Sequence, residues 1–302
     1  MRQNRKWVRL VIPILAAALL LAGCAIVPYG GGTGDGGSGR TDEDWDQGMI
    51  EVDDGGISRW IRDYENVPVN PLDPEAFEYG DGIVRYLGDG YTAAQGVDVS
   101  TFQGEIDWAA AAADGIGFAM IRIGGRGYES GAVYEDDRFL ENARRAAESD
   151  VHVGAYFFSQ AVTPEEAEEE AAFALEILDR LPEGTVTMPV AFDWEMIGQE
   201  GARTEYVDAE TLTACAAAFC RTIAAGGYEP MIYAYRYLAY ERYDLSELAG
   251  WPLWISTLDG DPDFYYAFSM WQYTEDGHVD GIPGRVDRDL WFAPAETGEE
   301  EP

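Results

Sequence analysis

From Gln95 onward, short apolar runs alternate with segments of helical periodicity, and this alternation constrains the fold more than any other feature of the chain. The five runs that helical segments separate span residues 96–100, 118–123, 151–158, 188–194 and 231–235. Strands that alternate with helices pair in parallel, because each crossover helix returns the chain to the start of the next strand. The pattern therefore predicts an α/β fold with a parallel sheet.

The intervening helices carry their own start and stop signals. Thr163 is an N-cap residue, Pro164 occupies the first helical position, and Glu166 completes a capping box. The glutamates from Glu165 to Glu170 are therefore predicted to form a solvated helix face. Two further helices are indicated by apolar residues on one face: Phe139, Ala143 and Ala146 in the first, and Leu212, Phe219 and Ile223 in the second, which ends at Gly226 and Gly227.

The alternation breaks in the last part of the chain. Residues 253–256, 268–273 and 286–292 look like strands, but the connections between them contain Asp-Pro and Gly-Ile-Pro-Gly and leave no room for helices. About 200 residues are also too few for eight strand-helix units, which typically need about 250. We therefore predict a modified TIM-like barrel over residues 95–293, with five strand-helix units followed by three strands. In such barrels the carboxyl ends of the strands, here called the mouth, carry the catalytic groups.

Two carboxylates end the fourth apolar run and are the strongest indication of a catalytic site. Asp193 and Glu195 are two residues apart, so on a strand they project to the same face with α carbons about 6.6 Å apart. Paired carboxylates suit glycoside hydrolysis, in which one protonates the leaving oxygen and another stabilises the positive charge that develops on the sugar. The spacing is compatible with both retaining and inverting reactions. Asp98 in the first run and Asp287 on the last strand are further candidates at the mouth.

The N-terminus has the features of a bacterial export signal. Basic residues precede an apolar run from Leu10 to Leu21 that is too short and too one-sided for a typical membrane span. The sequence Leu21-Ala22-Gly23-Cys24 resembles the lipobox of bacterial lipoproteins, so residues 1–23 are predicted to be a signal peptide and Cys24 to be lipidated. The lipidated form would be anchored to the outside of the bacterial cell membrane, facing the cell wall. The alternative is ordinary secretion with no role for Cys24.

The predicted barrel is flanked by segments of different composition. Residues 24–44 are predicted to be a flexible Gly-rich tether behind the lipidated cysteine. Residues 45–94 are rich in Asp, Gly and Pro and show no sustained period, which predicts an N-terminal extension that packs partly on the barrel. Residues 294–302 form an acidic tail.

The net charge, the cysteines and the histidines limit which partners, disulfides and metal sites are expected for this protein. The formal charge is −36 at pH 7, which repels polyanions and argues against a nucleic-acid partner. Cys215 and Cys220 are five positions apart on a predicted helix, about 140° around its axis, so they are not expected to pair with each other. His152 and His278 have no partners at metal-binding spacing. We expect no metal, no cofactor and a monomer.

Ordered motifs between about Ala94 and Phe292 resemble the family 25 glycoside hydrolases. The motifs are Gly96-Val97-Asp98-Val99-Ser100, Gln103-Gly104, Ile106-Asp107-Trp108, Val153-Gly154-Ala155-Tyr156-Phe157-Phe158, Phe192-Asp193-Trp194-Glu195, Met270-Trp271-Gln272-Tyr273, Gly281-Ile282, Gly284 and Val286-Asp287. This family comprises lysozymes of the N-acetylmuramidase type. The resemblance implies a five-helix, eight-strand barrel that cleaves the β-1,4 bond between N-acetylmuramic acid and N-acetylglucosamine in peptidoglycan glycan strands.

The resemblance also implies roles for individual residues. Glu195 matches the general acid, Asp193 matches the aspartate that assists at the anomeric centre, and Asp98 and Asp287 match acids on the first and last strands. It further suggests that the substrate's own 2-acetamido group attacks the anomeric carbon, with retention of the β-anomer. The substrate-binding candidates are Tyr156, Arg122, Tyr233, Trp254, Trp271 and Gln272, and the aromatic residues among them are equally compatible with core packing.

Three places depart from the family pattern. Residues 121–127 replace a frequent Lys-Ala-Thr-Glu-Gly, keeping a cation and containing glycines that are predicted to form a tight turn. Ser256-Thr257-Leu258 replaces Ala-x-Tyr, and Asp289 stands where Asn is frequent. Two other functions fit the same barrel: a chitinase-like amino-sugar hydrolase, and a cell-wall-binding lectin with weak catalysis. The lectin is disfavoured because all four central acids are present.

Overall fold

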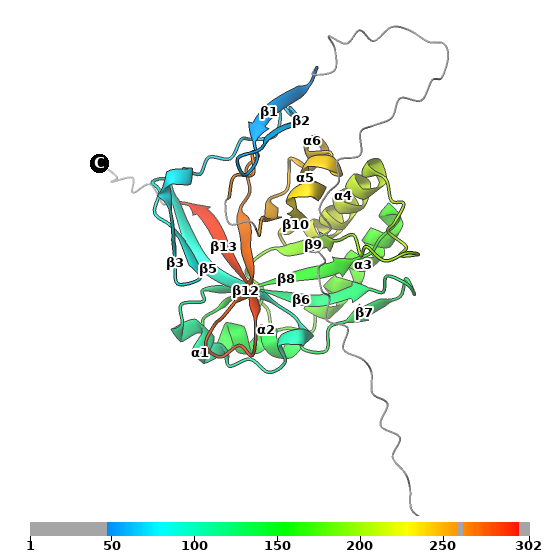
Figure 1. The fold of residues 1–302 in the computed structure, drawn as a ribbon. Helices are drawn as coiled ribbons and strands as arrows, with labels where there is room; N and C mark the ends of the chain where they lie inside the picture. The colour runs from blue at the N-terminus through cyan, green and yellow to red at the C-terminus, as the bar shows by residue number, and fades with distance from the viewer. Residues whose placement is uncertain (1–46, 259–261, 296–302) are drawn as a thin grey trace, which may run out of the picture. The chain divides into compact units, whose positions relative to one another are not determined.

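The computed structural model describes residues 47–258 and 262–295. The predicted signal peptide, Cys24 and the tether lie outside the described residues, as does most of the predicted acidic tail. The predicted modified TIM-like barrel is confirmed, with eight strands in one closed sheet and helices after the first five (Figure 1). No helix within the described ranges has the length and apolar character of a membrane span.

The barrel combines seven parallel strands with one antiparallel strand. The eight strands are β5 (Tyr91–Val99), β6 (Phe118–Arg126), β8 (His152–Ser159), β9 (Val190–Trp194), β10 (Pro230–Tyr235), β11 (Leu253–Ser256), β12 (Met270–Gly277) and β13 (Val286–Pro294). Strands β5 to β12 pair in parallel in this order. β13 closes the barrel because it runs antiparallel to both β12 and β5.

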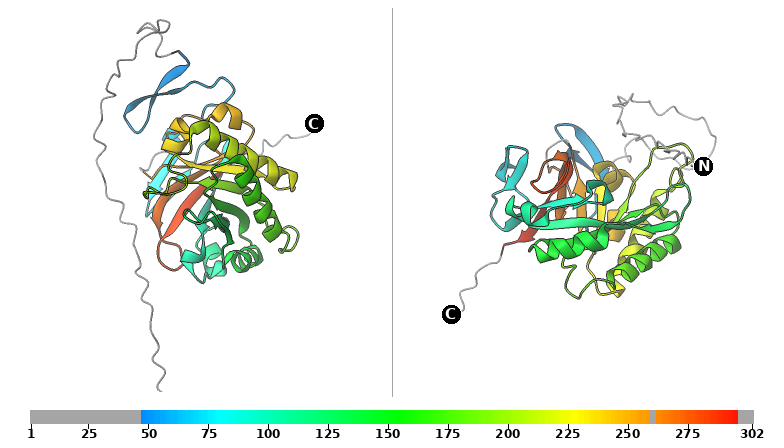
Figure 2. Two further views of the ribbon diagram at one scale, coloured as in Figure 1. Left: turned by 90° about the vertical axis from the view of Figure 1, so that its right-hand side faces the viewer. Right: turned by 90° about the horizontal axis from the view of Figure 1, so that it is seen from below.

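The helices follow the first five barrel strands and cover one side of the barrel, green to yellow in Figure 2. They are α1 (Trp108–Ala113), α2 (Phe139–Glu148), α3 (Pro164–Leu178), α4 (Ala209–Ala225) and α5 (Arg236–Glu241), followed by the short α6 (Leu245–Leu248). The Thr163 side chain accepts from the Glu166 backbone N–H, as predicted for the start of α3. One prediction for α3 is wrong: Glu170 is fully buried rather than solvated, because it pairs with Arg126 of β6.

Side chains alternate between the inside and the outside of the barrel along each strand. The inside holds a small apolar cluster of Phe118, Met120, Ala191, Met231, Tyr233, Trp254 and Met270. The outward side chains join a larger core with the helices, in which Cys215 and Cys220 of α4 are buried and unpaired, as expected from their spacing. The same alternation decides which polar side chains face the interior.

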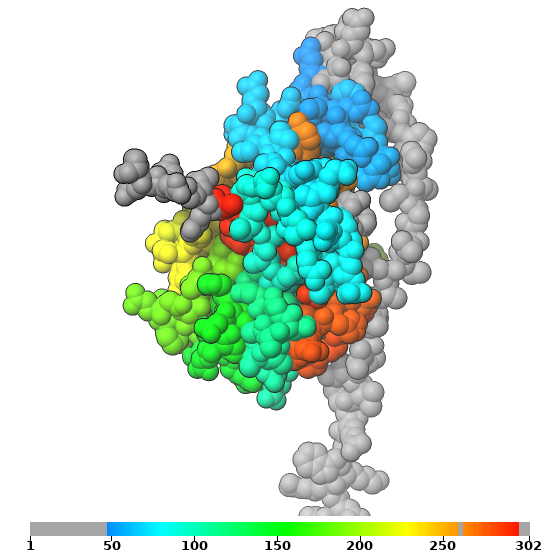
Figure 3. Space-filling model, turned by 90° about the vertical axis from the view of Figure 1, so that its left-hand side faces the viewer, coloured from blue at the N-terminus to red at the C-terminus, as the bar shows by residue number. Residues whose placement is uncertain are grey.

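The predicted N-terminal extension contains two antiparallel hairpins. They are β1 (Met49–Asp53) with β2 (Ser58–Arg62), and β3 (Phe77–Gly80) with β4 (Ile83–Tyr86), the second preceded by the 3-10 helix η1 (Pro74–Ala76). Phe77 packs edge-on against Trp271 and Phe292, with ring centroids 5.6 and 6.1 Å apart. Hairpin β3–β4 therefore covers the outer face of β12 and β13, and the cyan residues lie over the red and orange ones in Figure 3.

The predicted tight turn at residues 124–127 is instead part of a strand. Gly124 to Arg126 belong to β6 and pair with the short antiparallel strand β7 (Val133–Glu135). A Cβ at Gly124 would lie 2.3 Å from the carbonyl oxygen of Tyr134, so glycine permits this close pairing. The glycines extend β6 instead of ending it.

Candidate active site

The four predicted acids lie at the mouth of the barrel. Asp98 is near the carboxyl end of β5, Asp193 is near that of β9, and Glu195 directly follows β9. Because β13 is antiparallel, its amino end lies at the mouth, and Asp287 stands opposite Asp98 in the β5–β13 register. Residues that face each other across a strand pair project from the same face of the sheet. The antiparallel strand thus brings a C-terminal acid beside an acid from the first barrel strand.

Gln272 connects Asp98 to Tyr233 inside the barrel. Its Nε2 donates to Asp98 Oδ2 at 2.7 Å, and its Oε1 accepts from the Tyr233 hydroxyl at 3.0 Å. Since the amide nitrogen and the amide oxygen of Gln272 both have partners, the orientation of the amide is fixed. Gln272 and Tyr233, predicted as substrate-binding residues, therefore also hold Asp98 in place.

Asp289 is a fifth acid in the interior that the sequence analysis did not assign to the site. It lies two residues after Asp287 on β13, is 0 % exposed, and accepts from Trp254 Nε1 at 2.9 Å. The signal that could have found it is the strand period, since residues two apart share a face.

Burial and mutual repulsion raise the pKa of these carboxyls. Burial raises the pKa of Glu195 to about 7, and the charge of Asp287 adds to this effect. Burial also raises the pKa of Asp287 to about 6, although its hydrogen bond with Asp98 opposes the rise. The pKa of Asp98 is well above its ordinary value, first because of burial and then because of Asp287 and Asp289. The site therefore holds protons near neutral pH, as general acid catalysis requires.

The negative charges of Asp193 and Glu195 repel each other. Burial and the charge of Glu195 raise the pKa of Asp193, while Arg122 opposes the rise. Asp193 Oδ1 has no hydrogen-bond partner within the described residues. When either carboxyl carries a proton, the repulsion between the two disappears, so the pair favours one neutral and one ionised carboxyl.

Arg122 is the cation at this site, and it is held on two sides. Its Nη2 lies 2.8 Å from Asp136 Oδ2, and its guanidinium lies 5.0 Å from the ring centroid of Phe102. The Phe102 side chain is 82 % exposed, which leaves its ring open to solvent. Sequence reasoning missed Phe102 and Asp136, because neither belongs to an acid pair or to an apolar run.

The predicted sugar-stacking tryptophans are not available at the mouth. The Trp254 ring packs edge-on against Tyr233 and Tyr156, with centroids 4.9 and 6.0 Å away, and is only 2 % exposed. Trp271 is fully buried on the outer side of β12, where its Nε1 donates to Thr257 Oγ1 at 2.6 Å. The burial of both residues favours the core-packing alternative: the two tyrosines cover Trp254, and strand alternation turns Trp271 away from the interior.

A polar network, also missed from the sequence, supports the backbone of Glu195. Gln160 Nε2 donates to the Glu195 carbonyl oxygen at 3.0 Å, and Gln160 Oε1 accepts from Thr204 Oγ1 at 3.3 Å. Behind Gln160, the buried pair of Arg126 and Glu170 has an N–O distance of 2.7 Å. The segment that carries Glu195 is thus tied to α3 and β6.

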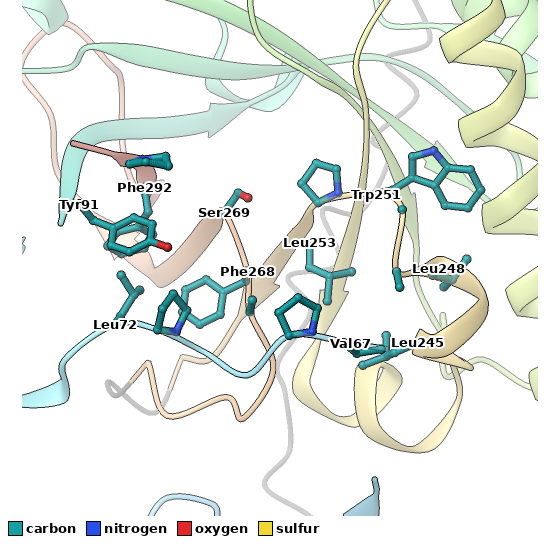
Figure 4. Close-up of a pocket in the computed structure, with 17 residues that line it drawn as sticks. Val67, Leu72, Tyr91, Leu245, Leu248, Trp251, Leu253, Phe268, Ser269 and Phe292 are labelled. Carbon is teal, nitrogen blue, oxygen red and sulfur yellow. The ribbon is translucent and has the colours of Figure 1, made fainter. Parts of the chain in front are cut away.

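An apolar cavity of about 330 Å³ lies at the other end of the barrel (Figure 4). Its lining includes Leu253 at the start of β11, Tyr91 at the start of β5 and Phe292 near the end of the antiparallel β13. These positions mark the end of the barrel opposite to the mouth. The cavity contains none of the acids described above.

Comparison with known proteins gives matches over the barrel. The profile of Glycosyl hydrolases family 25 matches residues 97–282, which is more than half of the chain. Lysozyme M1 from Streptomyces globisporus is 36% identical over 77 residues, corresponding to 25% of this chain and 24% of that protein. The chain thus spans about a quarter of the length of this relative.

Solved structures share the fold. The bacterial lysozyme from Streptomyces coelicolor has a TM-score of 0.52 and 22% identity, covering 66% of this chain and 91% of that chain. The modular autolysin LytC from Streptococcus pneumoniae was solved in complex with a synthetic peptidoglycan ligand. It has a TM-score of 0.57 and 20% identity, and the match covers 81% of this chain and 57% of that chain. At these identities the likeness establishes a common barrel.

Proposed function

Because the chain belongs to glycosyl hydrolase family 25, we propose that it is an N-acetylmuramidase that cleaves the β-1,4 bond between N-acetylmuramic acid and N-acetylglucosamine in peptidoglycan. One observation carries the proposal: Glu195 stands at the mouth with a pKa raised to about 7, two residues from the Asp193 carboxyl, whose pKa its charge raises. A protonated acid beside an ionised one is the pair that glycoside hydrolysis needs.

Glu195 is the proposed proton donor. Its pKa near the working pH lets it hold a proton in the resting enzyme and release it to the leaving oxygen. The hydrogen bond from Gln160 Nε2 to the Glu195 carbonyl oxygen limits the freedom of this segment. Such support keeps the carboxyl aligned with the glycosidic oxygen.

Asp193 is proposed to stabilise positive charge at the anomeric centre. In the proposed route the substrate's 2-acetamido oxygen attacks the anomeric carbon as the C–O bond to the leaving sugar breaks, giving an oxazolinium cation. The unpartnered Oδ1 of Asp193 is free to face this cation, and Arg122 favours its ionised form. Water then opens the oxazolinium ring and returns the proton to Glu195, so the β-anomer is retained.

Clearing of purified cell-wall suspensions by the soluble domain tests the activity. The wild type is expected to clear the walls and to leave chitin oligomers largely intact. Glu195→Gln should lower turnover by roughly 10²- to 10⁴-fold, the usual contribution of general acid catalysis, while keeping the fold. Equal turnover of chitin oligomers would favour the chitinase-like alternative, and wall binding without clearing would favour the lectin.

Proton NMR of the first product tests the route. Retention through the acetamido group predicts an initial β-anomer and little turnover of substrates that lack the N-acetyl group. An initial α-anomer would exclude this route, and a trapped glycosyl ester on Asp193 would replace it with direct nucleophilic attack.

The location of the enzyme is a second part of the proposal. We propose that residues 1–23 are removed, that Cys24 is lipidated, and that the Gly-rich tether of residues 24–44 places a monomeric barrel between membrane and wall. The Leu21-Ala22-Gly23-Cys24 sequence supports lipidation of Cys24. The lipid chain would then hold the protein at the membrane, because each buried methylene contributes about 0.8 kcal/mol. Wild type should enter the detergent phase and Cys24→Ser should stay aqueous, with equal wall-clearing activity. A wholly aqueous wild type would contradict the anchor.

A further inference from the structure

Asp289 occupies an unusual position, since it is an acid in the fully buried interior of the barrel. It is 0 % exposed and stands opposite Gly96 of β5 and Gln272 of β12 in the strand register. The space above Gly96 is filled by the Phe118 ring, because a Cβ there would lie 2.2 Å from that ring. Water therefore has little access to the Asp289 carboxyl, and an isolated charge there would be costly.

The hydrogen-bond partners of Asp289 account for only one of its oxygens. Oδ1 accepts from Trp254 Nε1 at 2.9 Å, whereas no donor reaches Oδ2 within the described residues. The groups that face it are Asp98 from β5, Gln272 from β12, Trp254 from β11 and Asp287 on its own strand. Within residues 47–258 and 262–295, no arginine forms an ion pair with Asp289.

The Asp98 and Asp289 carboxyls are close enough to hydrogen-bond to each other. Two ionised carboxylates cannot do so, because both are acceptors. Burial and the neighbouring carboxylates raise the pKa of both groups well above the ordinary value. One proton between the two oxygens would remove the repulsion and give Oδ2 its missing partner.

We propose that Asp98 and Asp289 share one proton and that Asp289 is a positioning residue for Asp98. Gln272 holds Asp98 Oδ2 at 2.7 Å, and the shared proton holds the same carboxyl against Asp289. Gln272 of β12 and Asp289 of β13 thus both restrain the Asp98 side chain, which stands opposite Asp287 at the mouth. This inference rests on the proposed function only for the effect on turnover, because the shared proton is a property of the resting protein.

Carbon-13 NMR titration of the aspartate carboxyls tests the shared proton without any substitution. The wild type should retain one proton on the Asp98 and Asp289 pair at pH 7. In Asp289→Asn, the amide N–H takes the place of the shared proton as hydrogen-bond donor to Asp98 at every pH. The substitution also removes the negative charge of the Asp289 carboxylate. Asp98 should then lose its proton at a lower pH than in the wild type. Two fully ionised carboxyls in the wild type at pH 7, or an unchanged Asp98 titration in the variant, would overturn the proposal.

Turnover of cell-wall fragments tests the positioning role. Asp289→Leu removes one of the partners of Asp98 and leaves Gln272 and Asp287, so kcat should fall by roughly 10- to 100-fold with little change in KM, the usual result of a misplaced group. Asp289→Asn should recover most of this loss, because the amide still bonds to Asp98. Asp276→Asn is the matched control, because Asp276 lies on the neighbouring β12 with a 65 % exposed side chain and should change neither kcat nor the titration.

The outcomes separate this inference from the proposed function. Equal losses in Asp289→Asn and Asp289→Leu would overturn the positioning role, since the carboxylate itself would then be required. A wild type that shows the shared proton but clears no cell walls would leave the proton assignment intact and would refute the proposed function instead. Thermal unfolding of each variant identifies a loss that comes from the fold.

Discussion

The barrel is covered on its outside in two different ways. On the side of β8 and β9, the helix α4 places Phe219 against Phe157 and Phe192, with ring centroids 6.3 and 5.2 Å apart. On the side of β12 and β13, hairpin β3–β4 of the extension places Phe77 against Trp271 and Phe292 at similar distances. A closed sheet needs its outer face buried, but the covering element does not have to be a helix.

The two sides also supply different parts of the site. The parallel, helix-covered side provides Asp193 and Glu195, the pair proposed to act on the substrate. The hairpin-covered side provides Asp98, Asp287 and Asp289, and Asp98 lies within hydrogen-bonding reach of the other two acids and of Gln272. The pair proposed to react and the group of acids around Asp98 thus come from different sides of the barrel.

Matched phenylalanine substitutions test whether the hairpin contributes as much to the free energy of unfolding as the helix does. Phe77→Ala and Phe219→Ala should each lower the free energy of unfolding by about 3 to 5 kcal/mol, the usual cost of removing a buried phenylalanine. Denaturant unfolding of the two variants measures this. A loss below about 1 kcal/mol for Phe77→Ala, with the full loss for Phe219→Ala, would mean that the extension is not part of the cooperative fold.

Acid substitutions test the division of the site between the two sides. Asp193→Ala should lower turnover by about 10²- to 10³-fold, because it removes the charge that faces the oxazolinium cation. Asp287→Asn should have a smaller effect, because its hydrogen-bonding partner Asp98 can bond to the amide. Initial rates on cell-wall fragments give both values. A larger defect in Asp287→Asn would reverse the assigned roles.

The pH dependence of stability should reflect the buried acids. The folded-state pKa of Glu195 is about 7, above its ordinary value, so the folded protein binds the proton more tightly than the unfolded chain. The stability that protonation of Glu195 contributes is therefore complete below about pH 4.3 and is lost as the pH rises through 7. The melting temperature should be higher at pH 5 than at pH 7.5. Glu195→Gln should reduce this difference, and an unchanged difference would remove Glu195 from the explanation.

The smallest expected effect is electrostatic, between Asp287 on the hairpin-covered side and Glu195 on the helix-covered side. Activity should decline above about pH 7 as Glu195 loses its proton. Asp287→Asn removes a charge that raises the pKa of Glu195, so the alkaline limb should move to lower pH, although burial, the larger cause, keeps the pKa raised. A pH profile of kcat/KM gives the shift. A limb that moves to higher pH would mean that Asp287 does not repel the Glu195 carboxylate.

Much of the helix-covered side could be predicted from the sequence. Its strands are continuous apolar runs, and the start of α3 has a cap whose chemistry is local, so a single stretch of sequence contains the evidence. The acids of the site were found for a similar reason, because the strand period places Asp193 and Glu195 on one face.

The hairpin-covered side could not be predicted in the same detail. Strands β1 to β4 are only four or five residues long and mostly polar on one side, so no sustained period marks them. Trp271 and Gln272 are adjacent in one motif, and only the barrel register tells which of them faces inward. Glu170 looked like its solvated neighbours, because its partner Arg126 lies 44 positions earlier in the chain.

The insertion of β13 between β12 and β5 also sets the order in which the molecule can be assembled. The pairing of Asp98 with Asp287 joins the first strand of the barrel to the last, so the contact is long-range in the chain. A chain that is synthesised from its N-terminus can pair β5 to β12 early, but it leaves the sheet edges at β5 and β12 open until β13 emerges. Long-range pairing of this kind forms late and slowly. The cluster of acids is therefore incomplete until nearly the whole barrel has been made, and a chain that lacks β13 lacks the Asp287 and Asp289 carboxyls beside Asp98.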